Sequence, residues 1–526
     1  MGETLKKWIE DWKNGKTEKL PDWIPVDEID DWLAFIRQHP ELEASDVKPV
    51  NESHELAEPP KPQTISQKET GANSVFKALK RIRAASIRNR DISFTALFHH
   101  LSKSMLIQAF YKLRKDAASG CDKVTWEDYE KNLGENIENL RKRLISWSYY
   151  PKPIRRTYIP KASGGLRPLG ICAIEDKIVQ YALKMILENI YEPRFKGMSY
   201  GFRPKTRAHD ALDAVYLAIT TKNVNYILDA DIVGCFDNIN RNILLEILKD
   251  NIGDKRILAL IKRLMDAGVL DKGELKILED GVVQGSTLSP LLANVFLDYV
   301  IDKFIIWWRS IFAKGEVYYV RYADDYILGF QYKEDAEHLL KVLKDRLLCA
   351  GLRLNSKKTR LIRFGRNVRT ASDDGKPVET ETFDFLGFTH KCGIAYVSRQ
   401  FKLVRNCISK RITKKLMEIE EKLDKLIFCP LKEVIKWINS VLEGYFAYFA
   451  VPDNLQMLSS FRFAVMKLLH KKLCRLSQRS KWTWKAFNNH IEPAIIRPRQ
   501  RHPYPRYRMQ ARQKTLQEER RSIRPC

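Results

Sequence analysis

The sequence predicts an α+β fold built from several modules. Its 526 residues are 44% hydrophobic and 10% aromatic, which is enough apolar material for folded cores and excludes a chain that is disordered throughout. Helical periodicity, as over 174–191 and 333–349, alternates with strand-like runs that end at turns, as over 155–171. Helices mixed with hairpins in this way favour an α+β architecture over an all-helical or all-strand one.

Charge is distributed unevenly along the chain. The formal net charge is +26, yet residues 1–70 hold 9 Lys and Arg against 16 Asp and Glu. Residues 399–526 hold 29 Lys and Arg against 10 Asp and Glu. A strongly basic second half indicates a polyanionic partner, and nucleic acid is favoured over lysines that serve only solubility.

The cysteines and the apolar runs bear on the compartment. The nine cysteines are scattered and form neither a C-x-x-C pair nor a metal-finger spacing, which predicts reduced thiols in a cytoplasmic protein. Residues 1–12 are charged, and no run of about 18 apolar residues occurs. We therefore expect neither a signal peptide nor a membrane span.

Composition divides the chain into segments. The first is an acidic, tryptophan-rich accessory element that ends in a linker rich in Pro, Glu, Gln and Ser, and the last is a basic, proline-rich tail. Between them we expect a hairpin around Phe383–Val397 and helices from Phe401 to about Leu476. The predicted boundaries are 1–70, 71–222, 223–398, 399–480 and 481–526.

Three acidic residues interrupt strand-like runs. Asp231 ends the run from Tyr226, and the pair Asp324 and Asp325 follows the run from Val317. A buried carboxylate is costly unless it is paired or bound to a cation. A turn that presents two carboxylates toward a third on a neighbouring strand would make a magnesium site. Taken alone, an Ala-Asp-Asp sequence is more often a turn that faces solvent.

The acidic residues lie within a set of motifs. Tyr322–Asp325 (YADD) resembles the Y-x-D-D box of reverse transcriptases, and Leu228–Ile239 (LDADIVGCFDNI) resembles their first palm motif. Gly281–Asn294 (GVVQGSTLSPLLAN) is similar to the motif between these two, and Phe383–Phe388 (FDFLGF) to the primer-grip hairpin. Four motifs in the family's order make the resemblance specific.

Further motifs resemble the reverse transcriptases encoded by group II introns, and the resemblance covers about residues 95–490. It implies a right-hand polymerase with fingers, an antiparallel-sheet palm and a maturase-like helical thumb. It also implies two Mg²⁺ ions, for which Mn²⁺ is a substitute. The intron-type motifs are Ile159–Ile171 (IPKASGGLRPLGI), Tyr200–Pro204 (YGFRP), Gly351–Thr359 (GLRLNSKKT) and Trp437–Phe449 (WINSVLEGYFAYF).

The resemblance implies that acidic residues of the first palm motif and of the YADD box hold the catalytic metal. Asp231, Asp324 and Asp325 are the expected catalytic metal ligands, and Ile232 belongs to the same metal site. Asp237, six residues beyond Asp231, is expected to hydrogen-bond its own loop rather than to act in catalysis.

Five residues are expected at the deoxynucleotide. Lys161 and Arg167 flank a glycine-rich turn and would grip the triphosphate, the alternative being surface charge. Phe236 would exclude the 2′-hydroxyl of a ribonucleotide by its bulk, unless it is an ordinary core residue. Gln284 would contact the nucleotide without choosing among bases. Lys358 would approach the pyrophosphate as a general acid, although Lys357 is adjacent.

Other residues are expected at the primer and template. The thumb helices would follow the phosphates of the duplex with their basic faces. For Arg203 a structural ion pair is an equal alternative. The expected contacts are Arg203, Tyr322, Leu386, Gly387, Lys410, Lys414 and Lys471, with Lys472 on the same basic face.

Three hypotheses follow for the function. The first is an intron-encoded reverse transcriptase that also acts as a maturase and takes an RNA template, a DNA or RNA primer, deoxynucleotides and a structured intron RNA. The second is a domesticated relative in antiphage defence, CRISPR adaptation or DNA repair, with a protein partner bound through residues 1–50. The third is an RNA-binding splicing factor with a dormant polymerase, against which the intact acidic residues argue.

Overall fold

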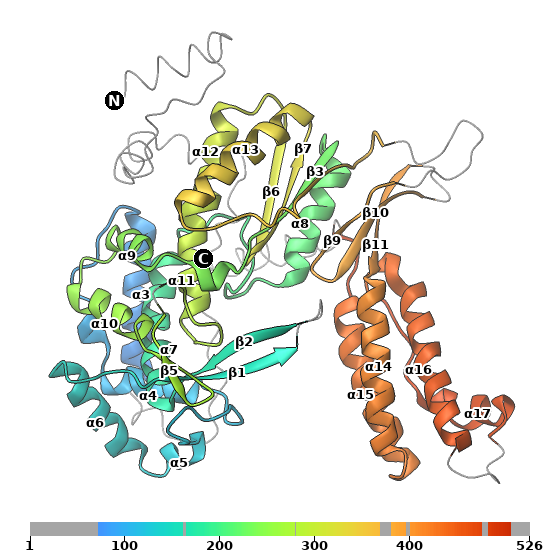
Figure 1. Ribbon diagram of the computed structural model, residues 1–526, viewed down its shortest axis with the longest axis horizontal. Helices are drawn as coiled ribbons and strands as arrows, with labels where there is room; N and C mark the ends of the chain where they lie inside the picture. The colour runs from blue at the N-terminus through green and yellow to red at the C-terminus, as the bar shows by residue number, and fades with distance from the viewer. Residues whose placement is uncertain are drawn as a thin grey trace, which may run out of the picture. The chain divides into compact units, whose positions relative to one another are not determined.

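The computed structural model describes residues 72–160, 165–278, 280–368, 380–395, 400–475 and 482–505, and these form two compact units (Figure 1). Of the described residues, the first unit takes those up to Ala211 together with Ala230–Tyr326 and Glu334–Thr359. The second takes Leu212–Asp229, Ile327–Lys333 and the described residues from Arg360 onward. Helices and strands are mixed in both units, which fits the predicted α+β class.

The first unit is mainly helical, and α7 (Ile174–Tyr191) has the range that the sequence predicts. It packs against α3 (Ala72–Arg88) and α4 (Lys103–Tyr111). Apolar residues occur on nearly every turn of α7, so most of its surface is buried. The other helices of this unit are α5 (Trp126–Glu130), α6 (Leu133–Ile145), α9 (Arg241–Lys249), α10 (Lys255–Met265), α11 (Ser289–Leu297), α12 (Lys303–Ile311) and α13 (Lys333–Cys349).

The predicted hairpin over 155–171 is confirmed. Strands β1 (Ile154–Pro160) and β2 (Leu166–Ile171) pair antiparallel, with Ile159 opposite Arg167. β1 also pairs in parallel with β4 (Val269–Asp271), so the sheet order is β2-β1-β4-β5. β5 spans Glu274–Lys276. Lys161 lies outside the described residues.

A second four-stranded sheet carries the acidic motifs. Its order is β6-β7-β3-β8, with β6 at Val317–Tyr322 and β7 at Asp325–Phe330. β3 (Tyr226–Asp231) pairs antiparallel with β8 (Arg360–Arg363). Five successive residues of β7 are buried, as expected for a strand covered on both faces. The strand and hairpin predicted around the three aspartates are therefore present.

The second unit contains a three-stranded antiparallel sheet and a group of helices. The sheet order is β11-β10-β9, formed by Phe383–Phe385 (β9), Phe388–Ile394 (β10) and Phe401–Cys407 (β11). The prediction that helix begins at Phe401 was wrong for these seven residues, and helix begins at Ser409. The helices are α8 (Ala208–Thr221, which begins in the first unit), α14 (Ser409–Leu426), α15 (Leu431–Phe449), α16 (Leu455–Arg475) and α17 (Trp484–His490).

The described part of the basic tail packs on the second unit. Arg501 forms an ion pair with Glu443 of α15 at 2.6 Å, and the Tyr504 hydroxyl donates to Asp453 at 3.1 Å. The rest of the tail and the predicted acidic segment lie outside the described residues. Among the helices that the structure describes, none combines the length and the apolar character that crossing a bilayer requires.

Candidate active site

The turn between β6 and β7 holds the acidic pair. β6 ends at Tyr322 and β7 begins at Asp325, so Ala323 and Asp324 make the turn. Ala323 has a φ of 58°, a left-handed backbone conformation that residues other than glycine rarely adopt. Its backbone lies against Gly201, where a Cβ atom would come within 2.2 Å of the Ala323 nitrogen. The turn therefore requires a glycine at position 201.

A buried ion pair holds the strand that enters this turn. The guanidinium of Arg321 donates to both carboxylate oxygens of Asp302, at 2.7 Å and 2.5 Å. It also donates to the Ala323 carbonyl and to the Asn294 side chain, each at 3.0 Å. Asn294 in turn donates to the Gly201 carbonyl at 2.8 Å. Arg321 was missed at the sequence level, although a charged residue inside an apolar strand was the available signal.

Asp302 reaches Arg321 from a π-helical segment. The segment η4 (Asp298–Asp302) lies between α11 and α12, and all five of its residues are buried. A π-helical turn shifts the register of the residues that follow, and such turns are frequent at functional sites. Here the segment presents the carboxylate of Asp302 to the strand that carries the acidic motif.

Asp231 and Asp324 are close enough to influence each other. Burial raises the pKa of Asp324 and the negative charge of Asp231 raises it further, while Arg167 and Lys358 oppose the shift. The Asp231 carboxylate accepts hydrogen bonds from Asn355 Nδ2 at 3.2 Å and from Lys358 Nζ at 3.0 Å. Two neighbouring carboxylates, one of them poorly solvated, make a favourable site for a cation.

Oxygen ligands of this kind fit a divalent metal. Asp231 and Asp324 offer the carboxylate oxygens that Mg²⁺ prefers, and Ile232 has a buried side chain that leaves its backbone carbonyl as the donor. Asp325 is exposed at the start of β7. Within the described ranges, no group of three or more His, Cys, Asp and Glu side chains has a metal-binding arrangement. Of the three predicted carboxylates, Asp231 and Asp324 are thus linked by an electrostatic effect, that of Asp231 on the pKa of Asp324.

Cationic side chains face the carboxylate pair. Arg167 and Lys358 each oppose the rise in the pKa of Asp324, which places both charges in its neighbourhood. Arg167 is exposed on β2, and Lys358 is 61% exposed although it is paired with Asp231. Both are therefore accessible to an anion, as expected of residues that bind a triphosphate.

Phe236 lies on a short helix that is held by the segment Gly281–Asn294. This helix, η3 (Cys235–Asn238), follows Gly234, which has a φ of 51°. The Phe236 carbonyl accepts a hydrogen bond from the Val282 amide at 2.8 Å. Gly281 has a φ of 84°, and a Cβ atom there would lie 2.5 Å from the Asp237 carbonyl oxygen. Close backbone contact with Gly281 and Val282 therefore fixes the loop that carries Phe236.

The next residues of the motif contact strand β2. The Gln284 carbonyl accepts from the Gly170 amide at 2.6 Å. Gly285 has a φ of 101°, and a Cβ atom there would lie 2.5 Å from the Gly170 carbonyl oxygen. Gly285 therefore makes a close approach to the backbone of β2. The Gln284 side chain is partly exposed.

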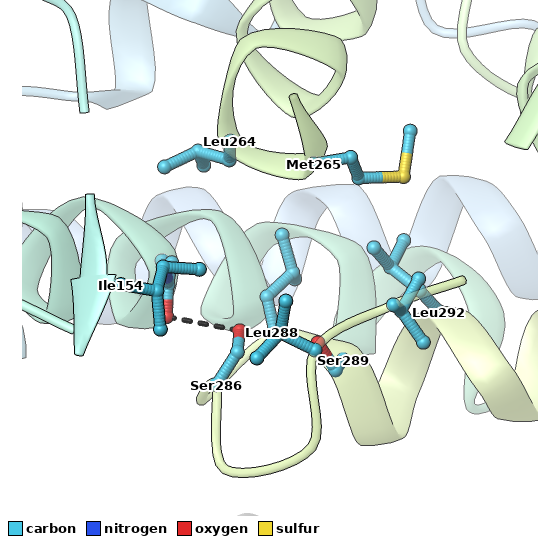
Figure 2. A pocket seen from close by; sticks show the side chains of 10 residues that line it. Ile154, Leu264, Met265, Ser286, Leu288, Ser289 and Leu292 are labelled. Atoms are coloured by element: carbon cyan, nitrogen blue, oxygen red, sulfur yellow. Dashed lines mark hydrogen bonds between the residues drawn. The ribbon is translucent and has the colours of Figure 1, made fainter. Parts of the chain in front are cut away.

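A small cavity lies behind this segment (Figure 2). Leu264 and Met265 of α10 line one side, and Leu288 and Leu292 line the other. The Ser286 hydroxyl donates to a Gln180 side chain at 3.1 Å. The cavity holds about 20 Å³, room for roughly one water molecule. It is too small for a nucleotide, so the carboxylate pair and the cations around it remain the candidate site.

Arg203 is committed to contacts within the protein. Its guanidinium donates to Glu192 at 2.8 Å and to the carbonyls of Lys196 and Ser199 at 2.8 Å and 2.6 Å. Only 10% of the side chain is exposed. These contacts favour the structural ion pair over the predicted contact with primer or template.

The predicted primer-grip residues form the turn between β9 and β10. Leu386 and Gly387 have φ values of 47° and 88°. The Leu386 carbonyl accepts from the Tyr448 hydroxyl at 2.8 Å, and a Cβ atom at Gly387 would lie 2.8 Å from Arg411 Nη1. Helices α14 and α15 therefore support this turn in the second unit.

The basic residues on α14 and α16 differ in exposure. Lys410 is exposed, and Lys471 is half exposed with an ion pair to Glu420 at 3.5 Å. Lys414 is partly buried. Lys472 departs from the predicted basic face because it is buried and paired with Asp424. Lys410 and Lys471 are thus more accessible to phosphate groups than Lys472 is.

Comparison of the sequence with known proteins places the chain in a family. Residues 159–390 match the family model described as Reverse transcriptase (RNA-dependent DNA polymerase). Protein YkfC of Escherichia coli (strain K12) is 33% identical over 275 residues, 46% of this chain and 71% of that protein. The group II intron-encoded protein LtrA of Lactococcus lactis subsp. cremoris is 35% identical over 230 residues, 43% of this chain and 38% of LtrA.

An intron protein from a fungus extends the comparison. The uncharacterized 91 kDa protein in the cob intron of Schizosaccharomyces pombe is 27% identical over 437 residues, 70% of this chain and 52% of that protein. The chain thus spans most of YkfC but only about a third to a half of these two intron-encoded relatives. Divalent metal dependence is general to reverse transcriptases, and the carboxylate oxygens of Asp231 and Asp324 are candidate ligands for such a metal. The chain belongs to the reverse transcriptase (RNA-dependent DNA polymerase) family and, within it, to the group II intron-encoded reverse transcriptases and maturases.

Proposed function

We propose that the chain adds deoxynucleotides to a primer 3′ end on an RNA template, with two Mg²⁺ ions at Asp231 and Asp324. The observation that carries this proposal is the approach of the two carboxylates, which together with burial raises the pKa of Asp324. Bound Mg²⁺ would supply activation of the 3′-hydroxyl and charge stabilisation of the leaving pyrophosphate. Asp325 and the Ile232 carbonyl are the further candidate ligands, and Mn²⁺ prefers similar oxygen ligands.

The chain's own side chains would bind and orient the nucleotide. Arg167 offers a planar fork of donors for phosphate oxygens, and Lys161 is the proposed second cation. Lys358 holds Asp231 through its ammonium group and is the candidate proton donor to the pyrophosphate. Phe236 would exclude a 2′-hydroxyl by sterics, and Gln284 would contact the nucleotide.

We assign the segments as in a right-handed polymerase. Residues 71–222 would be the fingers with their N-terminal extension, and 223–398 the palm, which contains the sheet β6-β7-β3-β8. Residues 399–480 would be the thumb, whose helices α14 to α16 carry the basic side chains. Residues 1–70 would be an accessory element and linker, with a protein partner bound through residues 1–50. Residues 481–526 would be a basic arm, and its described part packs on α15.

A structured intron RNA is the proposed second partner. Two of the relatives reported above are named as intron proteins, and Lys410 and Lys471 of the second unit are exposed to a polyanion. Neither a defence or repair role nor a dormant polymerase is favoured by these relatives. The well-formed carboxylate pair also argues against a dormant polymerase.

Primer extension tests the proposal. Wild-type protein should extend oligo(dT) on poly(rA) with Mg²⁺, and Asp324→Ala should lose this activity while its RNA affinity stays near the wild-type value. The matched control is Asp345→Ala, because Asp345 is an exposed aspartate of the same unit, on α13. It should extend the primer like wild type. Extension by Asp324→Ala at the wild-type rate would contradict the assignment of the metal site.

A further inference from the structure

The ring of Phe236 has an aromatic neighbour from a different motif. The Phe202 ring lies edge-on to the Phe236 ring, with centroids 6.2 Å apart and planes at 89°. Edge-to-face pairs at this separation are mutually attractive because the positive ring edge meets the negative ring face. The contact joins the YGFRP segment to the loop of Phe236, the residue proposed above as the steric gate against a 2′-hydroxyl.

The backbone at Phe202 is held in an unusual conformation. Phe202 has a φ of 58°, which a bulky residue adopts only when its surroundings impose it, and its side chain is 51% exposed. The preceding Gly201 is fixed by the Asn294 hydrogen bond and by its contact with the Ala323 nitrogen. The Thr206 hydroxyl donates to the Tyr200 carbonyl at 2.5 Å. The backbone that carries the Phe202 ring is therefore held in place, and the ring lies against Phe236.

The loop of Phe236 is held through its backbone. Among the described residues, Phe202 is the one aromatic residue whose ring contacts the Phe236 ring. The Phe236 carbonyl is bonded to Val282 and the neighbouring Asp237 backbone rests on Gly281. These contacts hold the main chain and do not themselves act on the side-chain torsions of Phe236, whose ring is partly buried. A ring packed edge-on restricts those torsions, and Phe202 supplies it.

We propose that Phe202 is a specificity-determining positioning residue, which holds the Phe236 ring in the orientation that excludes a 2′-hydroxyl. The inference rests on the proposed function, since it takes Phe236 as the steric gate. Phe202 also follows Gly201, which contacts the turn of Asp324, so one segment supports both the catalytic turn and the gate. Sugar discrimination is then a property of two aromatic rings rather than of Phe236 alone.

Single-nucleotide incorporation measures the effect. For each variant, kcat/KM is determined with a deoxynucleotide and with the matching ribonucleotide on the same RNA template and DNA primer. The ratio of the two values is independent of the fraction of folded enzyme, so a loss of stability alone leaves it unchanged. Phe202→Ala should lower the ratio about fivefold, which is what one ring–ring contact supports. Phe202→Tyr keeps the ring and should keep the ratio.

Phe202→Gly separates the ring from the backbone. Glycine adopts a positive φ without strain, so this variant removes the ring while favouring the existing backbone. It should lose discrimination as Phe202→Ala does. The control Tyr150→Ala removes an aromatic side chain that is 67% exposed on the same unit, and its ratio should equal that of wild type.

Phe236→Ala separates the role of Phe236 as the steric gate from the role of Phe202 as the residue that positions it. It should lower the ratio more than Phe202→Ala, and adding Phe202→Ala to it should lower the ratio no further, because the two rings act as one unit. If Phe236→Ala keeps the wild-type ratio, the gate itself is wrong. If Phe236→Ala lowers the ratio while Phe202→Ala and Phe202→Gly do not, the gate stands and the role of Phe202 is overturned.

Discussion

Arg321 and Asp302 form an ion pair with no exposed side-chain surface, and the same guanidinium holds the Ala323 carbonyl of the turn that carries Asp324. Tyr319 donates to the same Asp302 carboxylate at 2.7 Å. The acidic turn is thus supported from inside the first unit by charges that themselves take no part in the proposed chemistry. Their removal affects the turn through stability and geometry.

Arg321→Met should destabilise the protein strongly, because it leaves the Asp302 carboxylate buried without its cation. Breaking such a pair from one side costs about 3–5 kcal/mol. Chemical denaturation followed by tryptophan fluorescence measures the loss. Lys249→Met breaks the exposed pair with Glu246 and serves as the control, with an expected loss below about 1 kcal/mol. Equal losses for the two variants would remove the special role of the buried pair.

Gly201→Ala should impair catalysis more than stability. The added Cβ atom would lie 2.2 Å from the Ala323 nitrogen, so the turn that carries Asp324 must move. A displacement of about 1 Å at a catalytic group costs about 100-fold in rate. Steady-state primer extension measures this loss.

Gly197→Ala is the matched control for the same loop. A Cβ atom at Gly197 meets no atom within 4 Å, so this variant should extend primers at the wild-type rate. Normal activity of Gly201→Ala would show that the contact with Ala323 is unimportant for the turn.

Lys358→Met should strengthen cation binding while slowing nucleotide addition. The Lys358 ammonium donates to the Asp231 carboxylate at 3.0 Å, and removing a positive charge at this range should raise divalent-ion affinity about fivefold. Titration with Mn²⁺, with the free ion followed by electron paramagnetic resonance, measures the affinity. Lys357→Met is the control, since Lys357 is exposed and adjacent. The prediction fails if both variants bind Mn²⁺ alike.

His390→Phe should reduce the acid sensitivity of the second unit. Burial first, and then the positive charge of Arg405, lower the pKa of His390 to about 3. Because this folded-state value lies below the unfolded value of about 6.5, the unfolded chain binds more protons between these pH values. The contribution to stability is full above pH 6.5 and is lost as the pH falls toward 3.

The expected loss of stability from His390 is large enough to measure by denaturation at two pH values. At pH 5 a single histidine of this kind costs wild type about 2 kcal/mol relative to pH 7. The His390 ring is stacked on Phe383 at 4.6 Å, a contact that phenylalanine can reproduce. Denaturation of both proteins at pH 7 and pH 5 should show a smaller drop for His390→Phe. Identical drops would mean that His390 is not the group responsible.

Part of the fold could be predicted because its signals are local. The apolar spacing of Ile174–Tyr191 and of Lys333–Cys349 predicts the helices that are present. Strand Phe401–Cys407 was assigned to helix because its inward positions alternate as Leu403, Arg405 and Cys407, and the buried arginine masks the apolar alternation. Tertiary contacts of Arg405, such as its approach to the Tyr216 ring, are invisible in the local sequence.

In the candidate site, too, some features have a local sequence signal and others depend on tertiary contacts. Asp231 and Asp324 were predicted from a motif; the charge of Asp231 acts on the pKa of Asp324, and their role as metal ligands stays a prediction. Gly201 and Gly281 act through backbone contacts with residues far away in the chain, at Ala323 and Asp237. Such contacts depend on the packing of separate elements, so no pattern around either glycine could predict them.

Incorporation of one dTTP into oligo(dT) on poly(rA), under single-turnover conditions, tests the central claim most directly. Wild type should incorporate with Mg²⁺, stop when the metal is chelated, and recover when Mg²⁺ is returned in excess. Asp231→Asn keeps the size of the side chain but removes the charge, so it should lose about 3 orders of magnitude or more in rate. Incorporation by Asp231→Asn at the wild-type rate, or by wild type without divalent metal, would contradict a metal-dependent polymerase at this site.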